Sequence, residues 1–369
     1  MQVREIIHND HDAVNALWGQ VWWPTRSEAG WRWLAANPVL RERPAPQGWV
    51  IEDKDGRIAA VLGALAQRYW RGHEVCYGLT GHSLVVSPHL RGASRHLITR
   101  IISEPGFTAC YTLNANILSH RLYGRFGFRA PPAAVADRKL AWVIDPLVCM
   151  TARALRHALD GRPRLARRVG EQLRPKARLW RDPVFKLPHD VTTFQPGAAY
   201  AEFWTRLRDE GGWLADRGPH VLEWRLQDPD LTTAPVMLAF QRGGEILGYA
   251  CAMFAKENPI EPLVLEIIDL QALNTAPLAV ARLMDALMAV ARQGGAAKLR
   301  LGMLSPRLHS QLGPHAVTAR SEGGWQHAHV RIAPNAPDLT SWAPTPYDGD
   351  LFMSLRPPPR PSFAALKAA

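Results

Sequence analysis

The stretch that decides the fold reads Ser83-Leu84-Val85-Val86-Ser87-Pro88-His89-Leu90-Arg91-Gly92-Ala93-Ser94. An apolar strand pattern ends at Ser87-Pro88, and the chain then passes through Arg91-Gly92 into a segment with the apolar spacing of a helix. A turn of this kind directs several backbone N–H groups, together with the positive end of the helix, at one point. That point favours an anion, and a pyrophosphate in particular.

A second informative block follows the next predicted strand and reads Asn116-Ile117-Leu118-Ser119-His120-Arg121-Leu122-Tyr123-Gly124-Arg125-Phe126-Gly127-Phe128. Its polar residues Asn116, Ser119 and Tyr123 stand at i, i+3 and i+7. Because this spacing repeats with the helical period, the three side chains are predicted to share one face of a helix.

Together the two blocks resemble the GNAT superfamily of acyl-CoA-dependent N-acyltransferases. The family pattern runs V-x-P-x-x-R-G-x-G-x-G in the first block and N-x-x-A/S-x-x-L-Y-x-x-x-G-F in the second, and the second block matches at each of those positions. The first block departs at Ser94 and His96, where the family usually has glycine. Side chains there narrow the approach of a phosphate to the backbone, although Ser94 Oγ can donate a hydrogen bond and Arg95 can add charge.

The resemblance implies that acetyl-CoA or another acyl-CoA is the co-substrate, with no metal. It assigns Asn116 to the pantetheine arm, with Ser119 beside it, and Val86 to the strand position that contacts the thioester region. The CoA pyrophosphate falls to the loop and first helical turn: Arg91, Gly92, Ala93, Ser94, Arg95 and His96.

The chemistry that the resemblance implies needs a group that donates a proton and a group that accepts one. The amine must lose a proton as it attacks the thioester, and the departing thiolate must gain one. Tyr123 falls on the family's proton donor. The general base stays open between His82, just before Ser83, Glu74, in the preceding turn, and a chain of waters, while a strand N–H polarises the carbonyl.

The order of elements predicts a mixed α/β fold (an α+β mixed sheet) that occurs twice, as two tandem GNAT-like acyl-CoA N-acyltransferase domains. In the first half the pattern predicts strands at 3–7, 49–52, 58–67, 109–113 and 140–144, and a further strand that runs to residue 86. The predicted helices of this half are at 11–23, 28–36, 94–103 and 117–126. In the second half it predicts helices at 199–208, 221–226, 279–292 and 306–312, with strands at 236–241, 245–252, 263–270, 298–303, 327–332 and 351–355.

The second copy lacks the chemical signature of the first. The strand at 263–270 leads into Asn274-Thr275-Ala276-Pro277 without an Arg-Gly turn, so this copy is not expected to bind CoA. Arg217, Trp224 and Arg225 are candidates for substrate binding, with internal anchoring of a carboxylate as the alternative for the two arginines. These residues and Tyr347-Asp348-Gly349-Asp350 resemble tandem GNAT-like proteins of cell-envelope or polysaccharide pathways, by analogy only; Asp348 and Asp350 can also simply shape a turn around Gly349.

Charge divides the chain into predicted domains at 1–150 and 191–369, joined by a basic linker at 151–190. Residues 151–186 hold eleven basic and three acidic side chains, so this segment carries +8 of the formal charge of +11. Three interpretations stay open for it: a solvated linker, an amphipathic element on an anionic membrane, and a nucleic-acid contact. Nucleic acid is disfavoured because no aromatic residues are interleaved through the run and no nucleic-acid module accompanies it.

Composition limits the class of protein further. The chain has 369 residues, 47% of them hydrophobic, which suits two folded domains rather than disorder. We expect a cytoplasmic protein, because there is no signal-peptide pattern at the start and no apolar run long enough for a membrane span. Arginine outnumbers lysine 37 to 7, which suggests a GC-rich bacterial genome. The reduced thiols are predicted to be Cys76, Cys110, Cys149 and Cys251, which have no zinc-ligand spacing.

The sequence therefore predicts an N-acyltransferase that moves an acetyl or longer acyl group from acyl-CoA to an amine of a small molecule or amino sugar. The first copy holds the acyl-CoA, and the acceptor is expected between the two copies. The alternative is a non-catalytic binding or scaffold protein that kept the fold but lost efficient CoA binding. Ser94 and His96 favour the alternative, and the intact block from Asn116 to Phe128 favours the enzyme. The sequence leaves the oligomeric state open.

Overall fold

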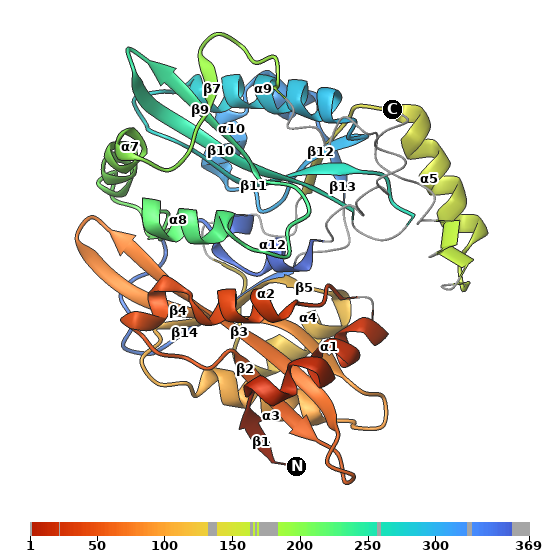
Figure 1. Cartoon of the computed structure of the whole chain (residues 1–369). Coiled ribbons are helices and arrows are strands. Elements are labelled where there is room, and N and C mark those ends of the chain that lie inside the picture. The colour runs from red at the N-terminus through yellow and green to blue at the C-terminus, as the bar shows by residue number, and fades with distance from the viewer. Residues whose placement is uncertain are drawn as a thin grey trace. The chain divides into compact units, whose positions relative to one another are not determined.

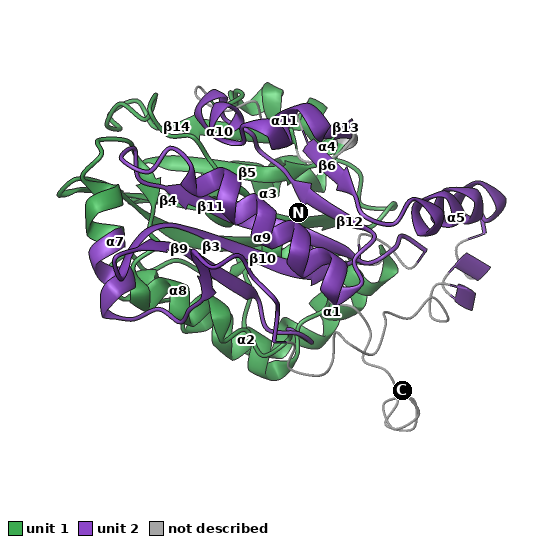
Figure 2. Ribbon diagram, turned by 90° about the horizontal axis from the view of Figure 1, so that it is seen from above, with its two compact units in different colours: residues 1–137, 204–230, 324–354 green, residues 138–203, 231–323, 355–369 purple. Residues whose placement is uncertain are grey.

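The computed structural model describes residues 2–21, 23–131, 139–162, 165–166, 168–169, 184–256, 260–322 and 327–355. These residues build two seven-stranded mixed sheets flanked by helices (Figure 1). The chain divides into two compact units, neither of which is a continuous piece of sequence (Figure 2). The predicted mixed α/β class and the repeated layout are both confirmed.

Unit 1 comprises residues 1–137, 204–230 and 324–354. Its sheet has the order β1-β2-β3-β4-β5-β14, with β8 paired to β3, and only the β4–β5 pair is parallel. The strands are β1 (Val3–Glu5), β2 (Gly48–Glu52), β3 (Ile58–Arg71), β4 (Glu74–Val86), β5 (Ala109–Ala115), β8 (Leu214–Ala215) and β14 (His327–Ile332). The helices are η1 (His8–Asp10), α1 (His11–Gln20), α2 (Glu28–Ala35), η2 (Pro38–Arg41), α3 (Ala93–Ile102), α4 (Ile117–Tyr123), η3 (Gly124–Phe126), α8 (Pro219–Leu226), η5 (Pro346–Asp348) and α12 (Leu351–Ser354).

Unit 2 comprises residues 138–203, 231–323 and 355–369. Its sheet has the order β13-β6-β12-β11-β10-β9-β7, again with one parallel pair, β11–β12. The strands are β6 (Lys139–Val143), β7 (Val191–Thr193), β9 (Val236–Arg242), β10 (Glu245–Ala255), β11 (Val264–Ala272), β12 (Lys298–Leu301) and β13 (Arg320–Glu322). The helices are α5 (Pro146–Ala158), α7 (Ala198–Arg208), inside which the unit boundary falls, α9 (Ala279–Gly294), α10 (Pro306–Gln311) and α11 (Pro314–Thr318).

The two sheets exchange a strand, which differs from the predicted domain boundary at residue 150. The strand at 140–144, expected to close the first sheet, is β6 and pairs antiparallel with β12 of unit 2. The strand at 327–332, expected in the second copy, is β14 and pairs antiparallel with β5 of unit 1. Residues 204–230 also belong to unit 1, because β8 pairs with β3 and α8 contacts η2.

Two further predictions need correction or fall outside the described residues. The predicted strand at 351–355 is the short helix α12 (Leu351–Ser354). The predicted linker at 151–190 begins inside α5, which starts at Pro146 and whose Arg156 forms a 2.8 Å ion pair with Glu261. Residues 163–164, 167 and 170–183, with most of the basic run, lie outside the described residues, so its membrane contact stays a prediction.

The sheet of unit 1 has helices on both faces. Successive residues of a strand point to opposite faces. A Cβ on Gly81 would lie 3.2 Å from Ile101 of α3, whereas the ring of the next residue, His82, lies 6.3 Å from that of Trp18 of α1. Helices α1 and α3 therefore cover opposite faces, and the two faces are called the α1 face and the α3 face below. The α3 face holds an apolar core with Leu62, Leu97 and Ile98.

In unit 2 the apolar positions of α9 follow the helical period and form the centre of the core. Leu283, Met284, Leu287 and Val290 are completely buried against β9, β10, β11 and β12. The helix ends at Gly294 and is capped by Gly295, whose φ of +76° is the left-handed conformation that favours glycine at this position. All four cysteines are free thiols, as predicted. Within the described residues, no helix is both long and apolar enough to cross a membrane.

Candidate active site

The strand β4 is distorted where the site is predicted. Val61 pairs with Val85 but Gly63 pairs with His82, so β4 carries one extra residue opposite β3. The extra residue falls at Ser83, whose φ of +54° is uncommon for a residue other than glycine. A bulge of this kind bends the strand and frees local backbone groups, and here Trp18 Nε1 donates to the Ser83 carbonyl at 3.3 Å.

Just before this bulge, β4 also loses its parallel neighbour. Both β4 and β5 are described throughout, and their pairing covers only Gly78–Thr80 against Ala109–Tyr111. From Gly81 to Val86 the edge of β4 that faces β5 therefore has no strand partner within the described ranges. Unpaired strand edges offer alternating N–H and C=O groups, and an extended ligand can bind them as a further strand does.

The loop after β4 presents unpaired backbone donors, as the first sequence block predicts. Leu90 and Ala93 use their amides inside the turn, but the amides of Arg91, Gly92 and Ser94 find no hydrogen-bond acceptor within the described part of the chain. Gly92 has a φ of +84°, and a Cβ placed on it would meet no heavy atom within 4 Å. Three donors, an open approach and the start of α3 form a geometry suited to a phosphate.

The side chains of this loop differ in what they can add. Ala93 is buried in the core of the α3 face, so it contributes backbone only. Arg91 and Arg95 are exposed and can supply positive charge, while Arg95 Nε donates to His96 Nε2 at 3.4 Å. Ser94 is half-buried in the first turn of α3.

The predicted face of Asn116, Ser119 and Tyr123 forms differently from the expectation. Asn116 precedes α4 and caps it, since its Oδ1 accepts from the Ser119 amide at 2.9 Å. Ser119 Oγ in turn donates to the Asn116 carbonyl at 3.1 Å. The first two residues thus fix the start of the helix that carries Tyr123, and any contact that they make with pantetheine stays a prediction.

Tyr123 ends α4 on the α3 face and is 5% exposed. Its ring packs against Phe128 at 5.0 Å and stacks on His329 of β14 at 5.5 Å. Burial raises the pKa of Tyr123 well above its usual value, and the charge of Asp350 raises that pKa further. The phenol therefore keeps its proton at neutral pH, as an acid that protonates a thiolate must.

His82 lies on the α1 face, beside the bulge, and is 2% exposed. Its Nδ1 is 2.9 Å from Ser83 Oγ, whereas its Nε2 has no hydrogen-bond partner in the part of the chain that is described. Burial and then the charge of Arg26 lower the pKa of His82 to about 3. The imidazole is neutral at pH 7, and so low a pKa makes it a weak proton acceptor. A buried Nε2 without a partner suits hydrogen bonding to a substrate better.

Glu74 is not brought to this site. It is the first residue of β4 and forms a 2.6 Å ion pair with Arg71 across the hairpin. Val86 is the last residue of that strand, and at about 3.3 Å per residue the two are roughly 40 Å apart. We therefore leave Glu74 out of the candidate site.

Asp350 was missed as a candidate base, because a carboxylate next to glycine is typical of a turn. It is 2% exposed, and its Oδ1 accepts from the Leu113 amide of β5 at 3.3 Å. Leu113 lies two residues beyond the last pair that β5 forms with β4, so the carboxylate binds β5 where that strand no longer pairs with β4. Burial raises the pKa of Asp350 to about 7, which suits a general base at neutral pH. Nothing in the local sequence signals this burial.

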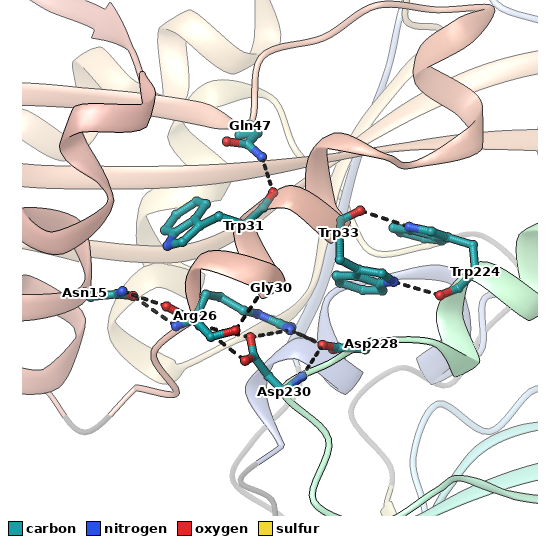
Figure 3. A network of polar contacts seen from close by, with 10 residues as sticks. Asn15, Arg26, Gly30, Trp31, Trp33, Gln47, Trp224, Asp228 and Asp230 are labelled. Carbon is teal, nitrogen blue, oxygen red and sulfur yellow. Dashed lines mark hydrogen bonds and ion pairs between the residues drawn. The ribbon is translucent and has the colours of Figure 1, made fainter.

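Two of the three predicted substrate-binding residues have structural partners instead. Arg217 donates to Asp348 at 2.5 Å, to Thr345 Oγ1 at 2.9 Å and to the Ala215 carbonyl at 2.7 Å. Trp224 stacks on Trp33 with ring centroids 4.4 Å apart, and each indole N–H donates to the other residue's carbonyl (Figure 3). Both residues hold α8 and the late segment of unit 1 in place.

The same contact region continues into a buried ion pair. Arg26 donates to both carboxylate oxygens of Asp228, at 2.8 and 2.6 Å, and lies 3.4 Å from Asp230 (Figure 3). Asp230 also accepts from the Ser27 amide. These contacts fix the start of α2 against the chain that follows α8, which explains why residues 204–230 belong to unit 1.

The third predicted residue, Arg225, lacks such partners. It is 7% exposed, and none of its three guanidinium nitrogens has a hydrogen-bond partner in the described residues. Its Cζ lies over the rings of Tyr347, at 4.0 Å, and Phe352, at 4.4 Å. Of the predicted trio, only Arg225 keeps its donors available.

This geometry has counterparts among solved structures. No protein-family model and no curated protein matches the sequence. The chain is similar to a GCN5-related N-acetyltransferase from Anabaena variabilis, with a TM-score of 0.54, 15% identity and coverage of 90% of this chain and 72% of that one. It is also similar to Saccharomyces cerevisiae N-myristoyltransferase, solved with bound myristoyl-CoA and inhibitors, with a TM-score of 0.56, 10% identity and coverage of 95% and 85%. A putative acetyltransferase from Pyrococcus horikoshii matches with a TM-score of 0.51, 12% identity and coverage of 94% and 95%.

The chain therefore has the GNAT fold, and it has it twice. The resemblance inferred from the two sequence blocks is confirmed for the fold. Identities of 10–15% show the fold alone, so the reaction has to be argued from the residues of unit 1.

Proposed function

We propose that unit 1 transfers an acyl group from acyl-CoA to the amine of a small molecule. The observation that carries this proposal is the end of β4, where a strand edge and then three amides of the turn have no partner among the described residues. An extended, polar thioester arm fits the first feature, and a pyrophosphate fits the second. The fold shared with acyltransferases of known structure supports the same ligand.

The residues around this edge supply the two proton transfers. Asp350 takes the proton that the amine loses as its nitrogen bonds to the acyl carbon, directly or through one water. Tyr123 gives its proton to the sulfur as the carbon–sulfur bond breaks. An N–H on the unpaired edge of β4 polarises the acyl carbonyl, and His82 Nε2 orients the acceptor on the α1 face.

The first test is a calorimetric titration of the full chain with acetyl-CoA and with a long-chain acyl-CoA. We expect micromolar binding of one donor, weakened about tenfold by Arg91→Ala through the loss of one phosphate contact. Arg292→Ala, which removes an exposed arginine of α9, serves as the matched control and should bind like the parent protein. If neither donor bound, the proposed enzymatic activity would be contradicted and the alternative of a non-catalytic scaffold protein, which Ser94 and His96 favour, would be supported.

A second test separates chemistry from binding. Tyr123→Phe should reduce turnover about 100-fold or more, because the thiolate then leaves without a general acid. Its affinity for acyl-CoA should stay within about twofold of the parent, because Tyr123 ends α4 and is not part of the loop at Arg91 and Gly92. A variant with full turnover would remove Tyr123 from the mechanism.

A further inference from the structure

The buried guanidinium of Arg225 has a cost that the described residues do not offset. Taking an ionised group out of water is unfavourable unless a counter-charge and hydrogen bonds replace the water. Arg225 is 7% exposed and has unpaired Nε, Nη1 and Nη2 atoms in the described chain. A protein keeps such a group where a ligand completes it.

Arg217 gives the contrast within the same unit. It is 1% exposed, yet its guanidinium is met by the Asp348 carboxylate, a threonine hydroxyl and a backbone carbonyl. Asp348 is also satisfied on its other oxygen, by Trp342 Nε1 at 2.8 Å. The fold thus gives the buried guanidinium of Arg217 several partners, whereas that of Arg225 has no hydrogen-bond partner among the described residues.

The surroundings of Arg225 select the chemistry of the missing partner. The Cζ of Arg225 lies over the rings of Tyr347 and Phe352, so aromatic rings contact the guanidinium while its nitrogens have no acceptor among the described residues. A planar fork of donors matches a planar carboxylate with two parallel hydrogen bonds. One buried positive charge balances one negative charge, so a carboxylate fits better than a doubly charged phosphate.

The position of Arg225 connects it to the acceptor side of the site. Tyr111 Oη donates to the Asp348 carbonyl at 2.7 Å, and the Cζ of Arg225 lies 4.0 Å from the ring centroid of Tyr347, the residue before Asp348. Tyr111 is the last residue of β5 that pairs with β4, and a Cβ on Gly78 would lie 3.0 Å from its ring. Gly78 and His82 are four residues apart on one strand, so Tyr111, like His82, faces the α1 side.

We propose that Arg225 binds a carboxylate of the acceptor, so that the acceptor is an amine that also carries a carboxylate. The role of the ligand as acyl acceptor rests on the proposed acyl transfer, whereas the binding of a carboxylate by Arg225 does not. The amine lies at the unpaired edge of β4, and the carboxylate is bound from α8 on the same face. An amino acid or an amino-acid-like compound has the two groups required.

The test compares each acceptor with its own amide. Glycine, β-alanine, 4-aminobutyrate and 6-aminohexanoate, each beside its carboxamide, are added to the full chain with the donor, and CoA release is measured with a thiol reagent. We expect the acids to react with a kcat/KM at least tenfold above their amides. Arg225→Gln should remove that preference, and Arg225→Lys should restore part of it because it keeps the charge without the fork.

A binding measurement runs beside it, without donor. The same acids should raise the melting temperature of the parent protein and not that of Arg225→Gln. Arg208→Gln is the matched control, since Arg208 also stacks on an aromatic ring, Trp70 at 4.6 Å, and should keep the response. The ligand-free Arg225→Gln protein should melt no lower than the parent, because it loses an unpaired buried charge.

The outcomes separate the two proposals. If the acids and their amides were acylated with equal kcat/KM, measured as CoA released from the donor, the carboxylate site would be overturned and acyl transfer would stand. Stabilisation by the acids that depends on Arg225, without CoA release from any amine, would support the site and overturn the transfer. Inorganic phosphate that stabilises the parent more than the acids do, again through Arg225, would overturn the assignment to a carboxylate.

Discussion

The junctions β4–α3 of unit 1 and β11–α9 of unit 2 have the same hydrogen-bond framework. In each, the amide of the first residue after the strand donates to a carbonyl of the neighbouring antiparallel strand, β3 or β10. Two further backbone hydrogen bonds follow in the turn, at intervals of three residues. The bonds of unit 1 are Ser87 N to Ala59 O, Leu90 N to Ser87 O and Ala93 N to Leu90 O; those of unit 2 are Leu273 N to Leu247 O, Ala276 N to Leu273 O and Ala279 N to Ala276 O.

The chemistry of the two junctions differs at the residues between those bonds. Arg91, whose amide is unpaired, corresponds to Pro277, which has no N–H at all. Gly92, with a φ of +84°, corresponds to Leu278, with a φ of −88° and an exposed side chain. Unit 2 thus keeps the turn but lacks one of its three amide donors, at Pro277, so the phosphate site proposed for unit 1 is not expected in unit 2.

The strand exchange gives the largest expected effect. If residues 1–150 and 151–369 are produced as separate chains, β5 lacks β14 and β12 lacks β6. We expect neither piece alone to show a cooperative unfolding transition, because each sheet loses a strand that buries its edge. Circular dichroism during urea unfolding measures this; an independently folded first piece would contradict the exchange.

Asp350→Asn should lower kcat/KM about 100- to 10,000-fold if this carboxylate is the base. In the parent protein the base works deprotonated, so kcat/KM should fall about tenfold per pH unit below pH 7, and the variant should lack that dependence. Stability changes in the opposite sense: because the pKa of Asp350 is raised to about 7, the buried charge destabilises the native state above pH 7 and this penalty vanishes below the ordinary value of 3.8. The free energy of unfolding of the variant should therefore exceed that of the parent by more at pH 8 than at pH 4.

Arg91→Pro tests the junction comparison itself. It removes the amide that Pro277 lacks in unit 2, whereas Arg91→Ala removes only the side chain. Loss of a hydrogen bond to a charged group costs about 1.5–3 kcal/mol, so the Kd for acyl-CoA should rise roughly 10- to 100-fold in the proline variant and less in the alanine variant. Equal effects would assign the contact to the side chain.

The smallest expected effect concerns two glycines, Gly63 of β3, which pairs with β4, and Gly248 of β10, which pairs with β11. A Cβ on Gly63 would come within 2.2 Å of the His82 ring, but on Gly248 of unit 2 the nearest contacts are 3.1 Å away. Gly63→Ala should cost about 1–3 kcal/mol of unfolding free energy through overpacking, and Gly248→Ala less. Thermal unfolding of the two variants ranks them, and the reverse ranking would show that His82 can move aside.

Local signals carried the sequence predictions as far as they succeeded. The turn at Arg91-Gly92, the helical spacing in α9 and the repeated order of elements are all encoded within short stretches, and the structure confirms them. The start of α4 at Ile117 was predicted, but Asn116 was assigned to the helix face of Ser119 and Tyr123 and not to the cap that it forms.

Long-range partners set the features that the sequence did not reveal. The segments at 139–143 and 327–332 are both short strands, and nothing in either states which sheet it joins. Leu351 to Ser354 is too short for its apolar pattern to distinguish strand from helix. Burial of Asp350 and Arg225 depends on segments that are distant in sequence, so their changed chemistry becomes visible only in the structure.

The exchange of β6 and β14 also bears on how the chain is made. On the ribosome, β5 emerges with its outer edge open, and its partner β14 follows roughly 200 residues later, which takes about 10–40 s at ordinary rates of synthesis. An open edge is a template for pairing with other chains. The nascent protein therefore spends that interval with unit 1 unfinished, and a chaperone that covers β5 should raise the yield of folded protein more than one that acts after release.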